Sequence, residues 1–126
     1  MSQTMIIAKM QPDHASQVAE IFARYDATEM PYQIGVTGRS LYRFHDLYIH
    51  LIDFARPSDE AMGIAQQLPS FRAVSEELKA YINAYDPNWR SPRDAMAARF
   101  YNWTASQAGD STLQHGALPL STSDRR

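Results

Sequence analysis

The sequence has 126 residues, of which 44% are hydrophobic and 21% charged, a composition typical of one globular domain. Its net charge of -2 and its scattered cations argue against a nucleic-acid partner, because phosphate neutralisation needs clustered Lys and Arg. The chain has no cysteine, which excludes disulfides, thiolate metal sites and cysteine nucleophiles.

Neither a membrane partner nor export is expected. No segment approaches the roughly 18 consecutive apolar residues of a membrane span. The first ten residues lack the charged, apolar and small-residue regions of a signal peptide. The sequence therefore predicts a cytoplasmic protein.

The first elements are a strand and a helix. Thr4–Met10 is a β-branched and apolar run that predicts a strand. Asp13 is expected to cap the following helix, and Pro31 to stop helical propagation. The buried face of this helix has the spacing i, i+3, i+4, i+7 and consists of Ala15, Val18, Ala19, Phe22 and Tyr25.

Two further strands, over residues 33–44 and 47–54, are predicted to form a hairpin around His45 and Asp46, although neither is the favoured turn glycine. Closing that turn pairs Phe44 with Leu47, Leu41 with His50, and Arg39 with Ile52.

The second half is predicted to hold two helical stretches and one strand. Ser58 is expected to cap a short helix over residues 60–68, and a last strand is expected over 96–104, after an irregular connection. A second helical stretch begins at Pro69 and presents one apolar face, made of Phe71, Val74, Leu78, Tyr81, Ile82 and Tyr85. We therefore expect one domain over residues 1–104 and a polar tail over 105–126, flexible or ordered by a partner.

This order, βαββαβ, predicts an α+β protein with the ferredoxin-like arrangement, in which helices cover one face of an antiparallel sheet. The uncovered face then needs a second sheet or a ligand.

The strand over 47–54 has two different faces, because side chains alternate along a strand. The aliphatic face of Leu47, Ile49 and Leu51 is expected to pack under the helices. The other face is aromatic and partly polar, as in a pocket lining, and consists of Tyr48, His50, Ile52 and Phe54. Arg39 shares the face of His50 as its diagonal neighbour, with Cβ atoms about 7–8 Å apart.

Asp26 lies where the first helix ends, beside Tyr25, and a carboxylate at that corner reaches the mouth of the same cavity. Asp26 and His50 do not have metal-site spacing, and no third ligand converges with them, so no metal is expected.

Four runs resemble the tetracenomycin-type aromatic polyketide cyclases: residues 25–31 (YDATEMP), 35–39 (GVTGR), 44–51 (FHDLYIHL) and 100–103 (FYNW). The resemblance covers about residues 4–104. It implies a dimeric α+β barrel and a cofactor-free aldol-type ring closure of a bacterial type II polyketide, followed by dehydration and aromatisation. The expected partners are an aromatic polyketide, a second copy of the chain and components of a type II polyketide synthase.

The resemblance also implies that Asp26, Arg39 and His50 are catalytic. His50, with an ordinary pKa near 6.5, is expected to exchange protons. Arg39 is expected to stabilise an enolate or alkoxide oxygen, and Asp26 to orient a base or activate a water. The family often has a histidine at the position of Tyr25, so the acid–base role of that histidine cannot be assigned to this chain.

The predicted substrate-binding residues are aromatic, because aromatic walls suit a flat polyphenol: Tyr25, Tyr48, Phe54, Phe100 and Trp103. Structural roles compete with several assignments. The competing interpretations are a core histidine for His50, a dimer salt-bridge partner for Arg39, and core or dimer contacts for Phe100 and Trp103.

Two other functions stay open. One is a cofactor-independent monooxygenase, for which Asn102 and Trp103 are candidates because related barrels oxidise similar polyphenols. The other is a non-catalytic chaperone subunit that shapes the polyketide.

Overall fold

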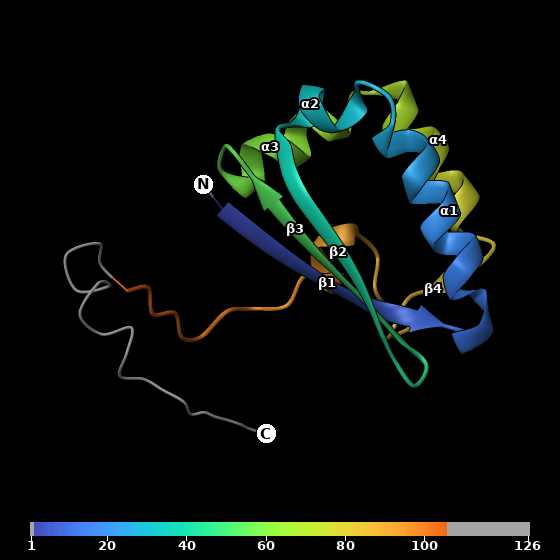
Figure 1. Cartoon of the computed structure of the whole chain (residues 1–126). Coiled ribbons are helices and arrows are strands. Elements are labelled where there is room, and N and C mark those ends of the chain that lie inside the picture. Colours follow the sequence, from blue (N-terminus) through green and yellow to red (C-terminus); the bar gives the residue numbers. More distant parts are fainter. Residues whose placement is uncertain (1, 106–126) are drawn as a thin grey trace.

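The computed structural model describes residues 2–105, and its centre is a four-stranded antiparallel sheet in the order β2-β3-β1-β4 (Figure 1). The elements follow in chain order as β1 (Ser2–Met10), a 3-10 turn (Pro12–His14), α1 (Ala15–Asp26), α2 (Met30–Ile34), β2 (Val36–Phe44), β3 (Leu47–Phe54), α3 (Ser58–Ala65), α4 (Pro69–Leu78), β4 (Ile82–Asn83) and a second 3-10 turn (Pro92–Ala95). The predicted α+β class and ferredoxin-like order are confirmed. The predicted tail lies outside the described residues, apart from Ala105.

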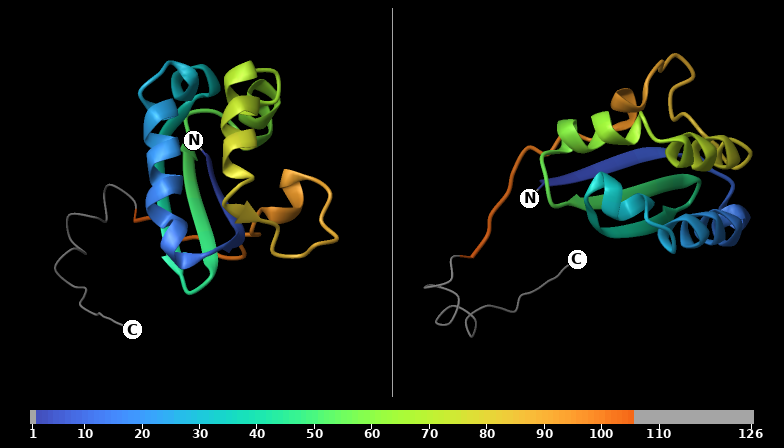
Figure 2. Two further views of the ribbon diagram at one scale, coloured as in Figure 1. Left: turned by 90° about the vertical axis from the view of Figure 1, so that its right-hand side faces the viewer. Right: turned by 90° about the horizontal axis from the view of Figure 1, so that it is seen from above.

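The four α-helices lie on one side of the curled sheet (Figures 1 and 2). Viewed from that side, α1 and α4 run in front of the strands, while α2 and α3 lie across one end (Figure 2). Within residues 2–105 no helix covers the opposite face of the sheet. No helix in this part of the chain is long and apolar enough to cross a membrane.

The β2–β3 hairpin has the predicted register. Phe44 pairs with Leu47, Leu41 with His50, and Arg39 with Ile52. The turn at His45–Asp46 forms without glycine, because His45 takes the left-handed conformation with φ of 56°. The register matters for the site, since a slip of one residue would turn Arg39 to the other face.

The helices cover the face opposite to the one predicted. Tyr48, His50, Ile52 and Phe54 are buried beneath them, whereas Leu47, Ile49 and Leu51 are only half-buried on the open face. The prediction that the aliphatic face packs under the helices is therefore wrong. The covered face carries the bulkier aromatic groups, which bury more apolar area, and its polar atoms bond to each other.

The fourth strand is Ile82–Asn83 and not residues 96–104. α4 ends at Leu78, so Ile82 leaves the predicted helical face and pairs with Met10 at the edge of β1. Met96 makes an isolated bridge to Ile6, and the chain beyond Ala97 leaves the edge. The aromatic composition of residues 100–103 suits a strand, but no strand edge pairs with them.

Ser58 does not cap a helix over residues 60–68. It is the first residue of α3, which ends at Ala65 and has Pro57 as its N-cap.

Two helix boundaries in the first half of the chain also differ from prediction. Asp13 lies within the 3-10 turn and does not cap α1, whose N-cap is His14. Pro31 lies in the first turn of α2, where a missing N–H costs nothing, so it starts a helix rather than stopping one. Consequently residues 33 and 34 belong to α2, and β2 begins at Val36.

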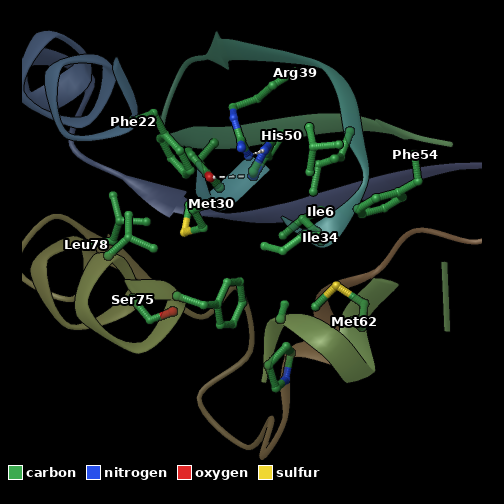
Figure 3. Close-up of a pocket in the computed structure, with 17 residues that line it drawn as sticks. Ile6, Phe22, Met30, Ile34, Arg39, His50, Phe54, Met62, Ser75 and Leu78 are labelled. Atoms are coloured by element: carbon green, nitrogen blue, oxygen red, sulfur yellow. Dashed lines mark hydrogen bonds between the residues drawn. The ribbon is translucent and has the colours of Figure 1, made fainter. Parts of the chain in front are cut away.

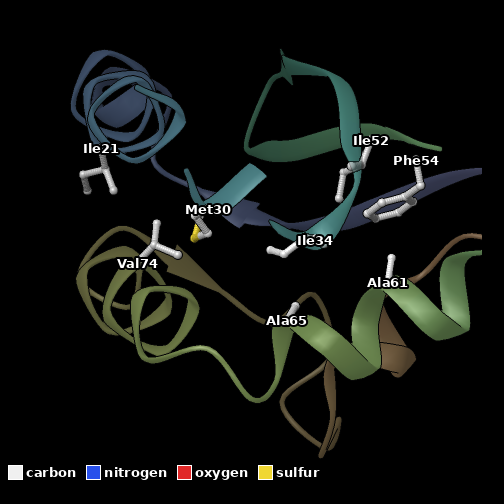
Figure 4. Close-up of a cluster of buried hydrophobic side chains, with 8 residues drawn as sticks. All are labelled: Ile21, Met30, Ile34, Ile52, Phe54, Ala61, Ala65 and Val74. Atoms are coloured by element: carbon white, nitrogen blue, oxygen red, sulfur yellow. The ribbon is translucent and has the colours of Figure 1, made fainter. Parts of the chain in front are cut away.

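The core between sheet and helices forms two clusters. The larger joins α1, α2, β3, α3 and α4 (Figure 4); its members are Ile21, Met30, Ile34, Ile52, Phe54, Ala61, Ala65 and Val74. The smaller joins β1, α1 and β3; its members are Ala8, Met10, Val18, Phe22 and Tyr48.

Gly35 allows α2 to turn into β2. It has φ of 94°, and a Cβ there would lie 2.6 Å from Nε of Arg56. We predict that Gly35→Ala lowers the free energy of unfolding by about 1–3 kcal/mol, through backbone strain and this contact. Gly63→Ala is the matched control, because Gly63 lies in α3 with nothing within 4 Å, and should be neutral or stabilising by up to about 1 kcal/mol. Urea unfolding measures both, and equal effects of the two substitutions would contradict the prediction.

Candidate active site

A cavity of about 200 Å³ lies between the sheet and the helices (Figure 3). Most of its wall is hydrocarbon, contributed by the strands, α1, α2, α3 and α4. Polar side chains enter the wall at only four places among the described residues: Arg39, Tyr48, His50 and Ser75. Three of these four come from β2 and β3, so the polar chemistry is concentrated on the sheet side.

Arg39 is held by the carboxylate of Asp26. Nε of Arg39 donates to Oδ2 of Asp26 at 2.9 Å, and Nη2 donates to Oδ1 at 2.8 Å. The Arg39 side chain is 12% exposed and that of Asp26 35% exposed. Asp26 is the last residue of α1, where a carboxylate is disfavoured by the helix dipole, and the guanidinium offsets that cost.

The same guanidinium fixes the tautomer of His50. Nη1 of Arg39 lies 2.9 Å from Nε2 of His50, and arginine can only donate, so Nε2 is the unprotonated acceptor. The proton of the neutral ring is then on Nδ1, which donates to the hydroxyl oxygen of Tyr48 at 3.0 Å. Tyr48 is therefore the acceptor of this hydrogen bond, and it does not donate its own hydroxyl proton to His50.

This arrangement leaves donors on Arg39 unused. A guanidinium has five N–H donors, and three point at Asp26 and His50, so two remain for a ligand. Phe22 of α1 packs on the group, with the ring centroid 4.9 Å from the guanidinium carbon and 5.0 Å from the His50 ring. The cation is thus fixed on three sides before any ligand binds.

Burial, reinforced by the positive charge of Arg39, lowers the pKa of His50 to about 3. Burial also raises the pKa of Tyr48 well above its usual value, and Arg39 opposes this only partly. Both side chains are therefore neutral near pH 7. The sequence does not show how deeply His50 is buried, so this lowering of its pKa from the ordinary value was not expected. Its proton exchange stays a prediction.

The structure brings the three predicted catalytic residues together in one chain of bonds, Asp26 to Arg39 to His50. Of the predicted binding residues, Tyr48 and Phe54 line the cavity. Phe100 and Trp103 do not line it and are 98% and 65% exposed.

Tyr25 also points away from the cavity. Its hydroxyl donates to Oε2 of Glu77 on α4 at 2.6 Å, and Arg24 donates to both oxygens of the same carboxylate. These hydrogen bonds, first from Arg24 and then from Tyr25, lower the pKa of Glu77 to about 2. Tyr25 therefore ties α1 to α4.

Sequence reasoning did not place Phe22 in the site. The signal was present, because Phe22 was on the predicted apolar face of the first helix. Periodicity distinguishes buried from exposed positions, but not a core contact from a contact with Arg39. Within residues 2–105 no group of three or more His, Cys, Asp or Glu side chains is arranged to hold a metal ion.

The chain is similar to several known proteins. Residues 2–104 match the family model for polyketide synthesis cyclases. Tetracenomycin F2 cyclase of Streptomyces glaucescens is 40% identical over 103 residues, covering 82% of this chain and 94% of the relative. An uncharacterized protein of Streptomyces coelicolor is 44% identical over 111 residues, covering 86% of this chain and all of the relative.

Polyketide synthase CurG of Streptomyces cyaneus is 38% identical over 104 residues, covering 82% of this chain and 97% of the relative. The solved structure of tetracenomycin F2 cyclase, a type II polyketide cyclase, superimposes with a TM-score of 0.78 at 39% identity. That match covers 84% of this chain and 100% of the other.

We predict that burial of neutral His50 makes the protein less stable in mild acid. The pKa of His50 is lower when folded than when unfolded, so below about pH 6.5 the unfolded chain takes up the proton first and stability falls. The free energy of unfolding should drop by about 1–2 kcal/mol more in the wild type than in His50→Gln between pH 7.5 and 5.5.

Urea unfolding at a series of pH values measures this difference. All other titratable groups are the same in the two proteins, so their contributions to the pH dependence cancel in the comparison. NMR titration of the wild-type imidazole gives an independent readout that needs no variant. A His50 ring that titrates with a midpoint near pH 6.5, or equal pH slopes in the two proteins, would contradict the prediction.

Proposed function

The chain belongs to the polyketide synthesis cyclase family, and on this premise we propose that it closes a ring of a type II aromatic polyketide intermediate by a cofactor-free intramolecular aldol reaction, followed by dehydration and aromatisation. The observation that carries the proposal is Arg39, a cation whose side chain is only 12% exposed in the wall of an apolar cavity, with two donors unused among the described residues.

Substrate binding begins with an oxygen of a 1,3-dicarbonyl unit that accepts from the free N–H groups of Arg39. In a site that excludes water, such a preplaced donor stabilises the enolate more than it stabilises the neutral ketone. The free hydroxyl proton of Tyr48 provides a further donor on the same side.

His50 receives the proton from the carbon between the two carbonyls. The substrate oxygen bound at the free N–H groups of Arg39 also draws the guanidinium away from His50, so the Nη1–Nε2 bond breaks and the lone pair on Nε2 can accept this proton. Burial, and then the charge of Arg39, lower the pKa of His50 in the free enzyme. The step is still allowed, because the negative enolate formed beside His50 stabilises the imidazolium against both effects.

Ring closure then needs no oxidant, reductant or other co-reactant. The enolate carbon forms a bond to a second ketone carbon of the same chain, and the C=O electron pair becomes an alkoxide. The imidazolium of His50 returns its proton to that alkoxide. Loss of the hydroxyl with a neighbouring C–H proton releases water and gives the double bond that leads to the aromatic ring.

Asp26 acts through Arg39 as a positioning residue. It is not among the residues that line the cavity, and its two bonds fix the guanidinium plane. Displacing a reacting group by about 1 Å can cost about 10²-fold in rate, which gives the expected scale of its contribution.

The apolar wall selects the folding of the substrate. A flexible poly-β-ketone can close many rings, and holding two reacting carbons together is worth about 7–11 kcal/mol in favourable cases. The cavity offers no support for the monooxygenase alternative, since neither Asn102 nor Trp103 lines it.

We also propose that two copies pair through the open face of the sheet. Tyr42 and Phe44 are 55% and 61% exposed there, and Met5 is 38% exposed. An exposed aromatic patch of this kind is typical of an interface. Sedimentation equilibrium should give twice the chain mass, and Tyr42→Glu should shift it toward one chain; a wild-type mass of one chain would contradict the proposal.

We predict that adding the protein to a minimal aromatic polyketide synthase changes the ring pattern of the products. Arg39→Gln should reduce the rate of the new product by about 10²–10³-fold, because it removes a donor to the developing oxyanion. Arg43→Gln is the matched control, since Arg43 is exposed on the same strand and does not line the cavity.

Chromatography of the products, with and without oxygen, measures the outcome. An unchanged product pattern with the wild type would reject the cyclase proposal. Full activity of Arg39→Gln would leave only the shaping role of a chaperone, and dependence on oxygen would indicate a monooxygenase.

A further inference from the structure

Ser75 is the only polar side chain that the helices contribute to the wall of the cavity, among the described residues. It lies on α4, across the cavity from Arg39 and His50 on the sheet (Figure 3). It is half-buried, and it is among the residues that line the cavity.

No side-chain hydrogen bond to another described residue occupies this hydroxyl. The side-chain hydrogen bonds of α4 within residues 2–105 involve Glu76 and Glu77, and none involves Ser75. A half-buried hydroxyl without a protein partner is available for a ligand oxygen.

Ser75 also lines an outer groove that shares part of its wall with the cavity. The groove runs along β4 and the segment after it, and its wall includes Trp89 and Arg90. The residues common to the walls of the cavity and the groove are Ile6, Tyr48, Ser75, Leu78 and Pro92. Of the two polar residues in this set, Tyr48 belongs to the reacting end of the site, beside His50, and Ser75 is the one on the helix side.

We propose that Ser75 is a specificity-determining residue, whose hydroxyl binds an oxygen of the polyketide at the passage from the cavity to the groove. The reacting ring lies at Arg39, and the rest of the substrate extends past Ser75 into the groove. This inference rests on the proposed function and names a residue that selects among its products.

The chemistry of the substrate gives the reason. A poly-β-ketone has an oxygen on every second carbon, and an oxygen buried against hydrocarbon without a donor is costly. The chain therefore settles at the depth where one oxygen meets Arg39 and another meets Ser75. That depth determines which pair of carbons reacts, so Ser75 affects binding and ring choice more than the chemical step.

The test compares three variants of the full chain. Ser75→Ala removes the hydroxyl, Ser75→Thr retains it, and Ser70→Ala removes a serine from the same helix that lines neither the cavity nor the groove. A polyhydroxylated anthraquinone serves as the binding probe. Each variant is also added to the minimal synthase, and its products are separated. Thermal unfolding confirms that each variant is folded, and alanine is expected to be tolerated because it is the best helix former.

For Ser75→Ala we expect the Kd of the probe to rise about 3- to 10-fold, the equivalent of one neutral hydrogen bond. The fraction of products whose ring is closed between the wrong pair of carbons should rise. The total rate of substrate consumption at saturation should stay near that of the wild type. Ser75→Thr and Ser70→Ala should retain the wild-type Kd and product ratio.

Wild-type Kd and product ratio in Ser75→Ala would overturn the inference, as would equal effects of Ser75→Ala and Ser70→Ala. Either result leaves the proposed function intact, provided that the wild type changes the ring pattern. Failure of the wild type itself to change that pattern is the separate result that rejects the proposed function.

Discussion

A cation in a largely apolar wall is the constraint on which this site depends. Arg39 is mostly withdrawn from water, and an unpaired guanidinium there would cost several kcal/mol. Asp26 supplies the charge, His50 the third acceptor and Phe22 the ring face. These partners come from α1 and β3, so the packing of α1 on the sheet and the register of the hairpin are both required to keep Arg39 in place.

The position of Arg39 also determines which nitrogen of His50 carries the proton. Because Arg39 occupies Nε2 of His50, the ring is neutral and its proton is on Nδ1, next to Tyr48. A free imidazole would exchange protons with solvent near neutral pH, whereas this one gains a useful lone pair only when a ligand replaces it at Arg39. In the proposed mechanism, binding and activation are therefore the same event.

The sequence was informative wherever a pattern depends on neighbours along the chain. The hairpin register followed from the two-residue turn, and with it the meeting of Arg39 and His50. The choice of the covered face failed, because alternation separates the faces of β3 but does not say which one the helices meet. Residues 96–104 do not form the predicted strand, because the chain meets the edge of β1 only at Met96 and Ala97 and then leaves it. The early end of α4 instead lets Ile82 pair with Met10. The pKa of His50 depends on burial by distant helices, which no local pattern contains.

The hydrocarbon wall of the cavity has a thermodynamic consequence. Covering apolar surface lowers the heat capacity of a complex, so the enthalpy of binding becomes more favourable as temperature rises. A flat aromatic ligand that covers Phe22, Ile52 and Phe54 would then bind with an affinity that passes through a maximum as the temperature changes. The few polar groups in the wall decide the orientation of the ligand, while the apolar majority decides at which temperature the protein holds it best.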